Sequence, residues 1–299
     1  MTTIADTLDL FIAELEHCRF RPNTCIAYGS DLKQAAQHLA GPLDQISLEQ
    51  IDTFLAAGDA SPATIARRAA SLKRFFGWAK RQGLCAANPM SDRETPRRAT
   101  RRLPRPVERR SDLATIDAAI AAAPKPYRLI FTLLRETGMR IGEVLALNFD
   151  DVLLEPGREG LRIREPKNGS ERIAPLGANA TPKSLRGLRA WLKERAVQPG
   201  YSPLFRSNRG TRVAYASAHY QWTQLCVRTG LADEVDGTPQ PRYTLHQLRH
   251  TRGTELVRQG QPLEIVQRVL GHRDIRSTQG YAELDHQQVR EALEQGSRR

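Results

Sequence analysis

The sequence has no apolar run approaching the roughly 18 residues that a membrane-spanning helix needs. Its first residues, 1–6, lack the basic region and the long apolar core of a secretion signal. Cysteine is scarce: the four cysteines among 299 residues show neither the paired spacing of a zinc site nor that of a redox motif. These absences predict a cytoplasmic protein with free thiols, no membrane association, no metal site and no cofactor.

Negative charge is also in short supply, with 33 acidic against 45 basic residues and a net charge of +12. A field of this sign attracts polyanions and speeds their encounter with the protein. Nucleic acid is the partner that the charge predicts first, and an acidic membrane surface comes second. A generally basic proteome would explain the charge without either partner. The length, with 40% hydrophobic residues, suits about two folded domains.

Residues 1–92 have the periodicity of a helical domain. The expected helices cover 7–16, 24–39, a segment beginning at Ser47, and a segment from Pro62 that stops at Gly83. Asn23 is the expected N-cap of the second helix, and Ile26 is expected on its buried stripe. Ser47 begins a capping pattern, and Ser61 precedes a proline at the first helical position.

The last of these helices has an apolar face and a basic face. The candidate DNA contacts on the basic face are Arg67, Arg68, Lys73 and Arg74. A basic face beside a packed apolar one suits contact with DNA phosphates, although a solvated surface would give the same pattern.

Residues 93–110 are expected to link two domains. Between 97 and 110 this segment has seven arginines against one acid, together with Pro104 and Pro106, so it cannot bury a core. Seven like charges on a bare linker would repel each other, whereas beside DNA they would be neutralised and would release counterions. The further candidate DNA contacts are therefore Arg101, Arg102 and Arg105.

Residues 111–299 mix helices with short strands, which makes the chain mainly α with a small antiparallel β-sheet in the second domain, an α+β class. Strand-like runs cover 151–154, 161–164 and 171–174, with turns between them. Helices are expected over 112–122, 126–136, 182–195, 215–229 and from Thr244 onward. Ser111 is the expected N-cap of the first of these helices.

Two arginines and a tyrosine in this domain suit an attack on a phosphodiester without metal. Guanidinium forks complement the equatorial oxygens of a phosphoryl transition state, and Arg140 and Arg249 are the candidates for such a clamp. Tyr281 is the candidate nucleophile, which needs a base or a positive field because a phenol normally has a pKa near 10. Taken alone, Tyr281 would more often be a packing residue.

Two histidines and a lysine complete the candidate set. His246 lies three residues before Arg249 on the same helix face and is a candidate acid or base. His272 follows a helix that Gly271 is expected to stop, and it is a candidate donor to a phosphate oxygen. Lys167, at a turn between two expected strands, could protonate the leaving 5′-oxygen. Each of these residues also has an ordinary structural explanation, and only their combination favours chemistry.

At these residues the chain resembles the tyrosine recombinases, the integrase family that includes XerC- and XerD-type enzymes. The resembling segments are 137–147, 245–251, 269–272 and 277–281. The stretch 167–176 resembles the β-hairpin that carries the catalytic lysine of the family. Residues 23–32 lie in a block that resembles its four-helix, SAM-like core-binding domain.

The resemblance implies a role for each candidate. Arg140 and Arg249 would bind the scissile phosphate, Lys167 would be the general acid, and the two histidines would assist proton transfer and hold the phosphate. Tyr281 would form a 3′-phosphotyrosyl link, so that rejoining needs no nucleotide cofactor. Arg252 departs from the pattern, because an apolar or aromatic residue is expected there. It would add a charge near the site or face DNA.

The resemblance also implies partners. The domain at 1–92 and the catalytic domain at 111–299 would close as a clamp around double-stranded DNA. Four protomers, as a homotetramer or with a paralogue, would exchange strands through a Holliday junction. A tail helix expected over 285–295 would dock on the neighbouring protomer or on its own domain.

Two other functions remain open at this point. One is relaxation of DNA by the same chemistry, as in a type IB topoisomerase, and the other is a DNA-binding or junction-binding protein without catalysis. The complete set of candidate residues argues against the second. The target DNA sequence does not follow from any of these patterns.

Overall fold

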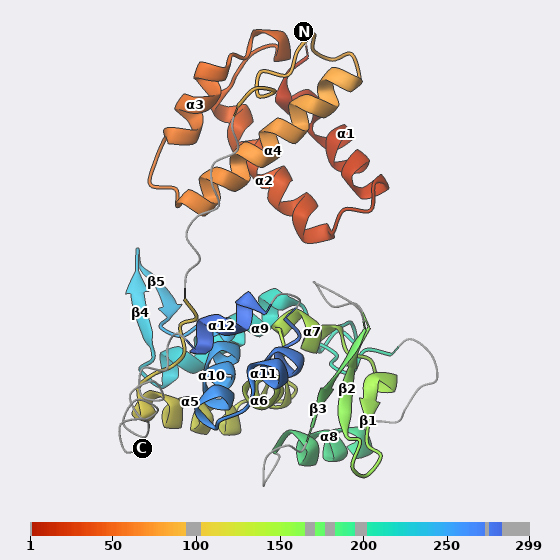
Figure 1. Cartoon of the computed structure of the whole chain (residues 1–299), viewed down its shortest axis with the longest axis vertical. Coiled ribbons are helices and arrows are strands. Elements are labelled where there is room, and N and C mark those ends of the chain that lie inside the picture. Colours follow the sequence, from red (N-terminus) through yellow and green to blue (C-terminus); the bar gives the residue numbers. More distant parts are fainter. Residues whose placement is uncertain are drawn as a thin grey trace, which may run out of the picture. The chain divides into compact units, whose positions relative to one another are not determined.

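The computed structural model describes residues 2–93, 103–164, 171–176, 183–194, 202–272 and 275–282. The chain divides into two compact units, Met1–Arg102 and Leu103–Arg299, coloured from red to orange and from yellow to blue in Figure 1. The predicted residues Lys167, Arg101 and Arg102 and the predicted tail helix lie outside the described residues. The predicted fold class, mainly α with small antiparallel sheets, is confirmed.

The first unit is helical in its described part. Its elements are α1 (Ile4–His17), α2 (Pro22–His38), the 3-10 helix η1 (Leu43–Gln45), α3 (Leu48–Ala56) and α4 (Pro62–Arg81). The expected capping box at Ser47 is present, and Ser61 accepts a hydrogen bond from the backbone of Thr64 at the start of α4. Phe11 and Phe75 meet edge to face at 5.4 Å in the core, where burial of each ring contributes about 2 kcal/mol.

Helix α2 differs from the prediction in two ways. It begins at Pro22 after Arg21, and Asn23 lies inside its first turn instead of capping it. Proline is favoured at the first position because its fixed φ suits the helix and its missing N–H is not needed there. Ile26 is 69% exposed, so the buried face of α2 runs instead through Cys25 and Leu32.

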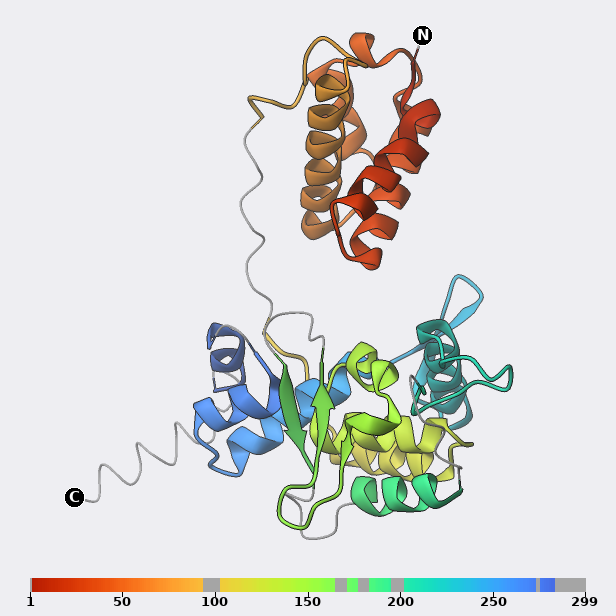
Figure 2. The ribbon, with the colours of Figure 1, turned by 90° about the vertical axis from the view of Figure 1, so that its right-hand side faces the viewer.

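The second unit combines helices with two small sheets (Figure 2). Its helices are α5 (Arg110–Ala122), α6 (Tyr127–Thr137), α7 (Ile141–Ala146), the 3-10 helix η2 (Phe149–Asp151), α8 (Lys183–Glu194), α9 (Tyr215–Arg228), α10 (Leu245–Arg258), α11 (Leu263–Leu270) and α12 (Arg276–Ala282). Its core includes Phe131 against Trp222, with ring centroids 5.4 Å apart. Helices α10, α11 and α12 pack against one another, and they carry the last three predicted motifs.

The three predicted strands form one antiparallel sheet in the order β1 (Val152–Leu153), β2 (Gly160–Ile163) and β3 (Arg172–Pro175). In the register, Leu161 faces Ala174 and Ile163 faces Arg172. A second sheet, the hairpin β4 (Ala232–Val235) and β5 (Thr238–Pro241), was not predicted. Its turn has Asp236 and Gly237 at positive φ, which is the backbone that an Asp-Gly hairpin turn requires.

The end of the predicted linker belongs to the second unit. Val107 is buried, and its backbone N–H donates to the hydroxyl of Thr251 on α10 at 2.9 Å. Helix α5 then begins at Arg110, one residue before the expected cap Ser111. Ser111 does not cap because its hydroxyl donates to the Asp112 carboxylate, which also accepts a hydrogen bond from Tyr243.

Candidate active site

Arg140 occupies the start of α7, directly after a tight turn. Helix α6 ends at Thr137, and Gly138 follows in the left-handed conformation with φ 66°. A Cβ at position 138 would lie 2.7 Å from the Leu270 side chain, so glycine is required for space as well as for φ. The turn places the Arg140 guanidinium beside the buried carboxylate of Glu143, at 2.8 Å between Nη1 and Oε1.

Glu143 connects this arginine to the sheet. Its Oε2 accepts a hydrogen bond from the backbone N–H of Arg140 at 3.0 Å and one from Nη2 of Arg172 at 2.9 Å. Arg172 lies at the start of β3, and its Nη2 also reaches the carbonyl of Leu270 at 3.2 Å. Strand β3 is therefore tied both to α7 and to the last residue of α11.

Arg249 is the most deeply buried arginine of the group, at 2% exposure. Its Nη1 donates to the carbonyl of Gly138 at 2.7 Å, and its Nη2 donates to the carbonyl of Leu270 at the same distance. Burial, followed by the charge of Arg140, lowers the pKa of Arg249 to about 10, so it stays protonated at neutral pH. Two carbonyls fix the plane of this guanidinium, while its other N–H groups are not used by those bonds.

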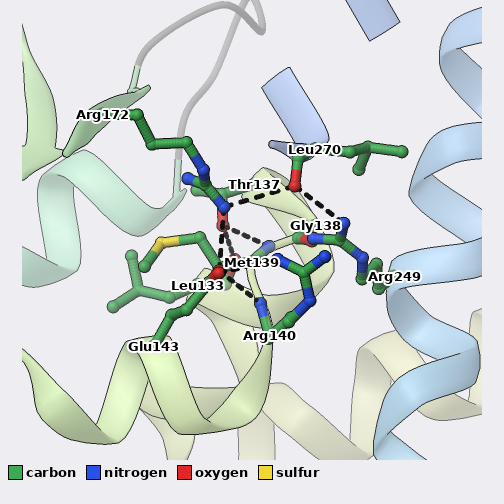
Figure 3. Close-up of polar contacts among 9 residues, drawn as sticks. All are labelled: Leu133, Thr137, Gly138, Met139, Arg140, Glu143, Arg172, Arg249 and Leu270. Atoms are coloured by element: carbon green, nitrogen blue, oxygen red, sulfur yellow. Dashed lines mark hydrogen bonds and ion pairs between the residues drawn. The ribbon is translucent and has the colours of Figure 1, made fainter. Parts of the chain in front are cut away.

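Figure 3 shows the resulting network, in which the guanidinium groups of Arg140 and Arg172 contact the Glu143 carboxylate and that of Arg249 shares the Leu270 carbonyl with Arg172. Burial lowers the pKa of Arg172, and Glu143 opposes that effect. Two positive charges of the network have no carboxylate within it to balance them. A concentrated, partly buried positive charge with a fixed geometry is what a phosphate diester needs for binding.

Tyr281, on α12, lies beside this network with its ring 1% exposed. Its hydroxyl is 3.0 Å from Nδ1 of His250, and its ring stacks on His272 with centroids 6.0 Å apart and planes 2° apart. The charge of Tyr281 acts on the pKa of Arg249, which places the phenol within electrostatic reach of that guanidinium. The candidate nucleophile is thus held between two histidines beside a buried arginine.

Both predicted histidines lie at this place. His246 is exposed and meets His250 edge to face, with ring centroids 4.5 Å apart. His272 follows the stop at Gly271, as expected, and its Nδ1 lies 3.0 Å from the hydroxyl of Thr278. Thr278 is buried on α12, which begins at Arg276.

The structure brings together five of the six predicted residues, and Lys167 lies outside the described part. It adds three that had not been assigned to the site's chemistry: Glu143, Arg172 and His250. Two of these had a usable signal. Arg172 comes five residues after Lys167 on the expected strand, and His250 follows Arg249 at helical spacing from His246.

Of the two alternatives predicted for Arg252, a charge near the site agrees with its place beside Gly138, whereas facing DNA does not agree with its burial. Its side chain is 8% exposed, packs against Gly138 and lies 3.8 Å from the Glu255 carboxylate. Glu255 also holds Arg135 through a bidentate contact at 2.6 and 2.8 Å. Arg252 is therefore part of a partly buried ion-pair cluster that ties α10 to α6.

The predicted DNA contacts of α4 have partners within the first unit. Arg67 pairs with the buried Asp31 at 2.6 Å and is 42% exposed, while Arg68 donates to Gln34 at 2.6 Å. Lys73 donates to two backbone carbonyls of the segment 91–93, and Arg74 lies over the ring of Phe20. DNA contact by these side chains stays a prediction. Arg105, in the second unit, is exposed.

Metal sites and membrane-spanning helices can be assessed for the described residues. Within them no group of three or more potential ligands is arranged to hold a metal ion, and no helix is long and apolar enough to cross a membrane. The four cysteines are free thiols, as expected, and three of them are buried.

Two family models match the chain. Residues 109–288 match the phage integrase family, and residues 8–83 match the phage integrase N-terminal SAM-like domain. Among solved structures, a lambda integrase dimer bound to a COC′ core site gives a TM-score of 0.68 at 20% identity, covering 94% of this chain and 77% of that one. The XerH recombinase bound to difH gives 0.64 at 22% identity, with 89% and 78% covered. These likenesses show the fold.

Sequence relatives are similar over nearly the whole length. The chain is 30% identical over 285 residues to the tyrosine recombinase XerC of Chromobacterium violaceum, covering 93% of this chain and 90% of that protein. It is 32% identical over 300 residues to XerC of Mycobacterium tuberculosis, with 95% of each covered. It is 33% identical over 283 residues to XerD of Ralstonia nicotianae, with 90% and 86% covered. The chain therefore belongs to the phage integrase family and is a site-specific tyrosine recombinase of the XerC and XerD type.

Proposed function

We propose that this recombinase cuts and rejoins double-stranded DNA through a covalent 3′-phosphotyrosine on Tyr281. The observation that carries the proposal is the place of that phenol, between two histidines and beside the buried guanidinium of Arg249. A phenol must lose its proton to attack phosphorus, and a positive field with a base nearby favours that loss.

The arginines bind the scissile phosphate. Arg140 and Arg249 are each held from behind, by Glu143 and by two backbone carbonyls, and so keep their orientation when the phosphate arrives. Guanidinium donors that are fixed before the reaction stabilise the charge on the non-bridging oxygens at no cost of reorganisation. The two guanidinium groups thereby stabilise the negative charge that develops on the phosphate.

Proton transfer involves the other candidates. His272, whose ring Thr278 orients, donates to a phosphate oxygen, and the exposed His246 exchanges protons at the entrance of the site. Lys167, on the segment between β2 and β3, protonates the 5′-oxygen as it leaves. Because the phosphodiester energy is kept in the tyrosyl link, rejoining needs no nucleotide cofactor.

Membership of the family supports a proposal for the assembly. A lambda integrase tetramer bound to a Holliday junction has a TM-score of 0.67 to this chain at 19% identity. We propose that this chain acts on two DNA sites as a tetramer, of itself or with a paralogue. The domain at 1–92 and the catalytic domain at 111–299 would clamp the duplex, and the tail at 285–295 would dock on the neighbouring protomer.

Covalent trapping on nicked DNA tests the nucleophile. The site is first located by footprinting on DNA that flanks the gene. A nick next to the scissile phosphate then lets the short fragment that carries the free 5′-hydroxyl diffuse away after cleavage. We expect a protein–DNA adduct that withstands denaturant, is lost in Tyr281→Phe and persists in Tyr220→Phe, whose tyrosine is exposed on α9.

An adduct that survives in Tyr281→Phe would assign the nucleophile elsewhere, and a bound site without any adduct would show that the chain does not catalyse. Strand exchange between two sites then identifies recombination, whereas relaxation of supercoils without exchange would indicate topoisomerase action.

A further inference from the structure

The hydroxyl of Tyr281 contacts a histidine that none of the six predicted roles includes. Nδ1 of His250 lies 3.0 Å from the Tyr281 hydroxyl oxygen, which is hydrogen-bond distance. The predicted acid or base, His246, lies one turn earlier on α10 and meets the His250 ring edge to face. The reacting atom of the proposed nucleophile is therefore in direct contact with His250.

The backbone of α10 brings the two side chains together. Gly253, one turn after His250, faces the tyrosine ring. A Cβ built there would lie 2.7 Å from Cζ of Tyr281 and 2.8 Å from Cε1. Real Cβ atoms do not approach ring carbons so closely, so α12 packs on α10 at this distance only because residue 253 is glycine. The tyrosine ring also stacks on the ring of His272.

The electrostatic surroundings keep His250 in the form that accepts a proton. The groups facing its ring are His246 and Arg249 on its own helix and Tyr281 on α12. Burial, then the charges of His246 and Arg249, lower the pKa of His250 to about 4. At neutral pH the imidazole is therefore uncharged and carries one nitrogen lone pair, which can accept the phenol hydrogen bond.

We propose that His250 is the general base of strand cleavage, an inference that rests on the proposed role of Tyr281. As the bond from the Tyr281 oxygen to phosphorus forms, Nδ1 of His250 takes the phenol proton. The bond from phosphorus to the 5′-oxygen breaks, and that oxygen takes a proton from Lys167. In rejoining, the 5′-hydroxyl attacks phosphorus and gives its proton back to Lys167, the bond from phosphorus to the Tyr281 oxygen breaks, and His250 returns its proton to the departing tyrosine.

The rate of covalent adduct formation in single turnover, from pH 5.5 to 9, tests this role in His250→Ala and His250→Asn. At neutral pH we expect both to lower the rate by about 10²-fold, the range of a general base, with unchanged DNA binding. The deficit should narrow as pH rises toward 10, because the phenol then ionises without a base. His219→Asn is the control, since His219 also packs on a tyrosine of a helix in this unit.

A site with sulfur in place of the 5′-bridging oxygen separates the base from the acid. A thiolate leaves without a proton, so this DNA should restore cleavage in Lys167→Ala and leave the deficit of His250→Ala in place. Restoration of both variants would overturn the inference.

Three other results would also overturn it. A deficit that is equal at every pH, or that is absent in His250→Asn, would reduce His250 to a positioning contact. Faster cleavage in His250→Ala would mean that the contact holds the tyrosine back. If His250→Ala fails to fold, as judged by its melting transition, the pH profile of His250→Asn decides.

An adduct that depends on Tyr281 but forms equally well without His250 would refute the inference alone, whereas an adduct that persists in Tyr281→Phe would refute the proposed function itself.

Discussion

At the scale of single residues, Glu143 has two cationic neighbours for one carboxylate. Its side chain is 5% exposed and lies within 2.9 Å of nitrogens of both Arg140 and Arg172. A buried carboxylate in this position offsets repulsion between guanidinium groups that would otherwise face each other without compensation. It thereby allows three arginines to share a small volume before any DNA is present.

Glu143→Gln keeps the shape of this side chain and removes its charge. We expect the free energy of unfolding to fall by about 2 kcal/mol, because two partly buried guanidinium groups lose their counter-ion. Inorganic sulfate should restore part of the loss by taking the place of the charge. Urea titrations with and without sulfate measure both effects, and Glu194→Gln, at an exposed ion pair with Lys125, is the control. Equal stability of Glu143→Gln and the parent would refute this role.

His250 gives the stability a pH dependence of known sign. Its folded-state pKa of about 4 lies below its ordinary value of 6.5, so the unfolded chain takes up the proton more readily between these two values. The stabilising contribution is complete above pH 6.5 and is lost as pH falls toward 4. From pH 7 to 5, the melting temperature should therefore fall further in the parent than in His250→Asn. An equal fall in both proteins would contradict the depressed pKa.

The sequence could predict residues whose chemistry is set by type and spacing, such as the His246–Arg249 pair. Helical spacing could place His250 near His246, but it could not assign the role proposed for His250, because that role depends on α12 approaching α10 at Gly253, a contact between segments 28 residues apart. The environment of Arg252 was missed for a related reason. A charged residue beside a catalytic motif suggests solvent or DNA, and only the fold shows that Arg252 is buried beside the partly buried Glu255.

At the scale of elements, the sequence predicted helix starts well where the signal is a hydrogen bond within the first turn. Ser47, Ser61 and Thr244 stand where helices were expected to start, and each accepts a hydrogen bond from the backbone N–H three residues further on, because such bonds lie within one turn. Asn23 failed because a neighbouring proline sets the first helical position. The β4–β5 hairpin was missed although Asp236-Gly237 is a hairpin signal, since its strands are short, polar and largely exposed and lack hydrophobic alternation.

The close packing of α12 on α10 gives a prediction at this scale. Gly253→Ala places a methyl group against the Tyr281 ring, so we expect α12 to shift and adduct formation to fall by at least about 10-fold, although alanine favours a helix over glycine by about 1 kcal/mol. Gly77→Ala on α4, whose added Cβ would lie 3.6 Å from the Asn88 side chain, is the control for the helix propensity. Adduct formation by Gly253→Ala at the parent rate would show that the approach is not needed.

At the scale of the whole molecule, the arginine-rich stretch before α5 lies between the segment that matches the SAM-like domain and the segment that matches the phage integrase family. We expect neutralising Arg101, Arg102 and Arg105 together to weaken DNA binding on every sequence. The slope of log affinity against log salt should become shallower by roughly 3, about one for each lost phosphate contact. Neutralising Lys183, Arg186 and Lys193 on α8 removes the same charge elsewhere and serves as the control. A salt slope equal to that of the parent would exclude phosphate contact by the three arginines.

Gly271 ends α11 with φ 65°, and a Cβ at this position would meet the guanidinium of Arg172, which Glu143 and the Leu270 carbonyl hold in place. The two positions are therefore coupled. A side chain at 271 would have to displace the Arg172 guanidinium from Glu143 and from the Leu270 carbonyl, besides adopting a φ that side chains rarely adopt. A shorter side chain at 172 would open that space, but it would also remove the contact that ties strand β3 to the arginine network.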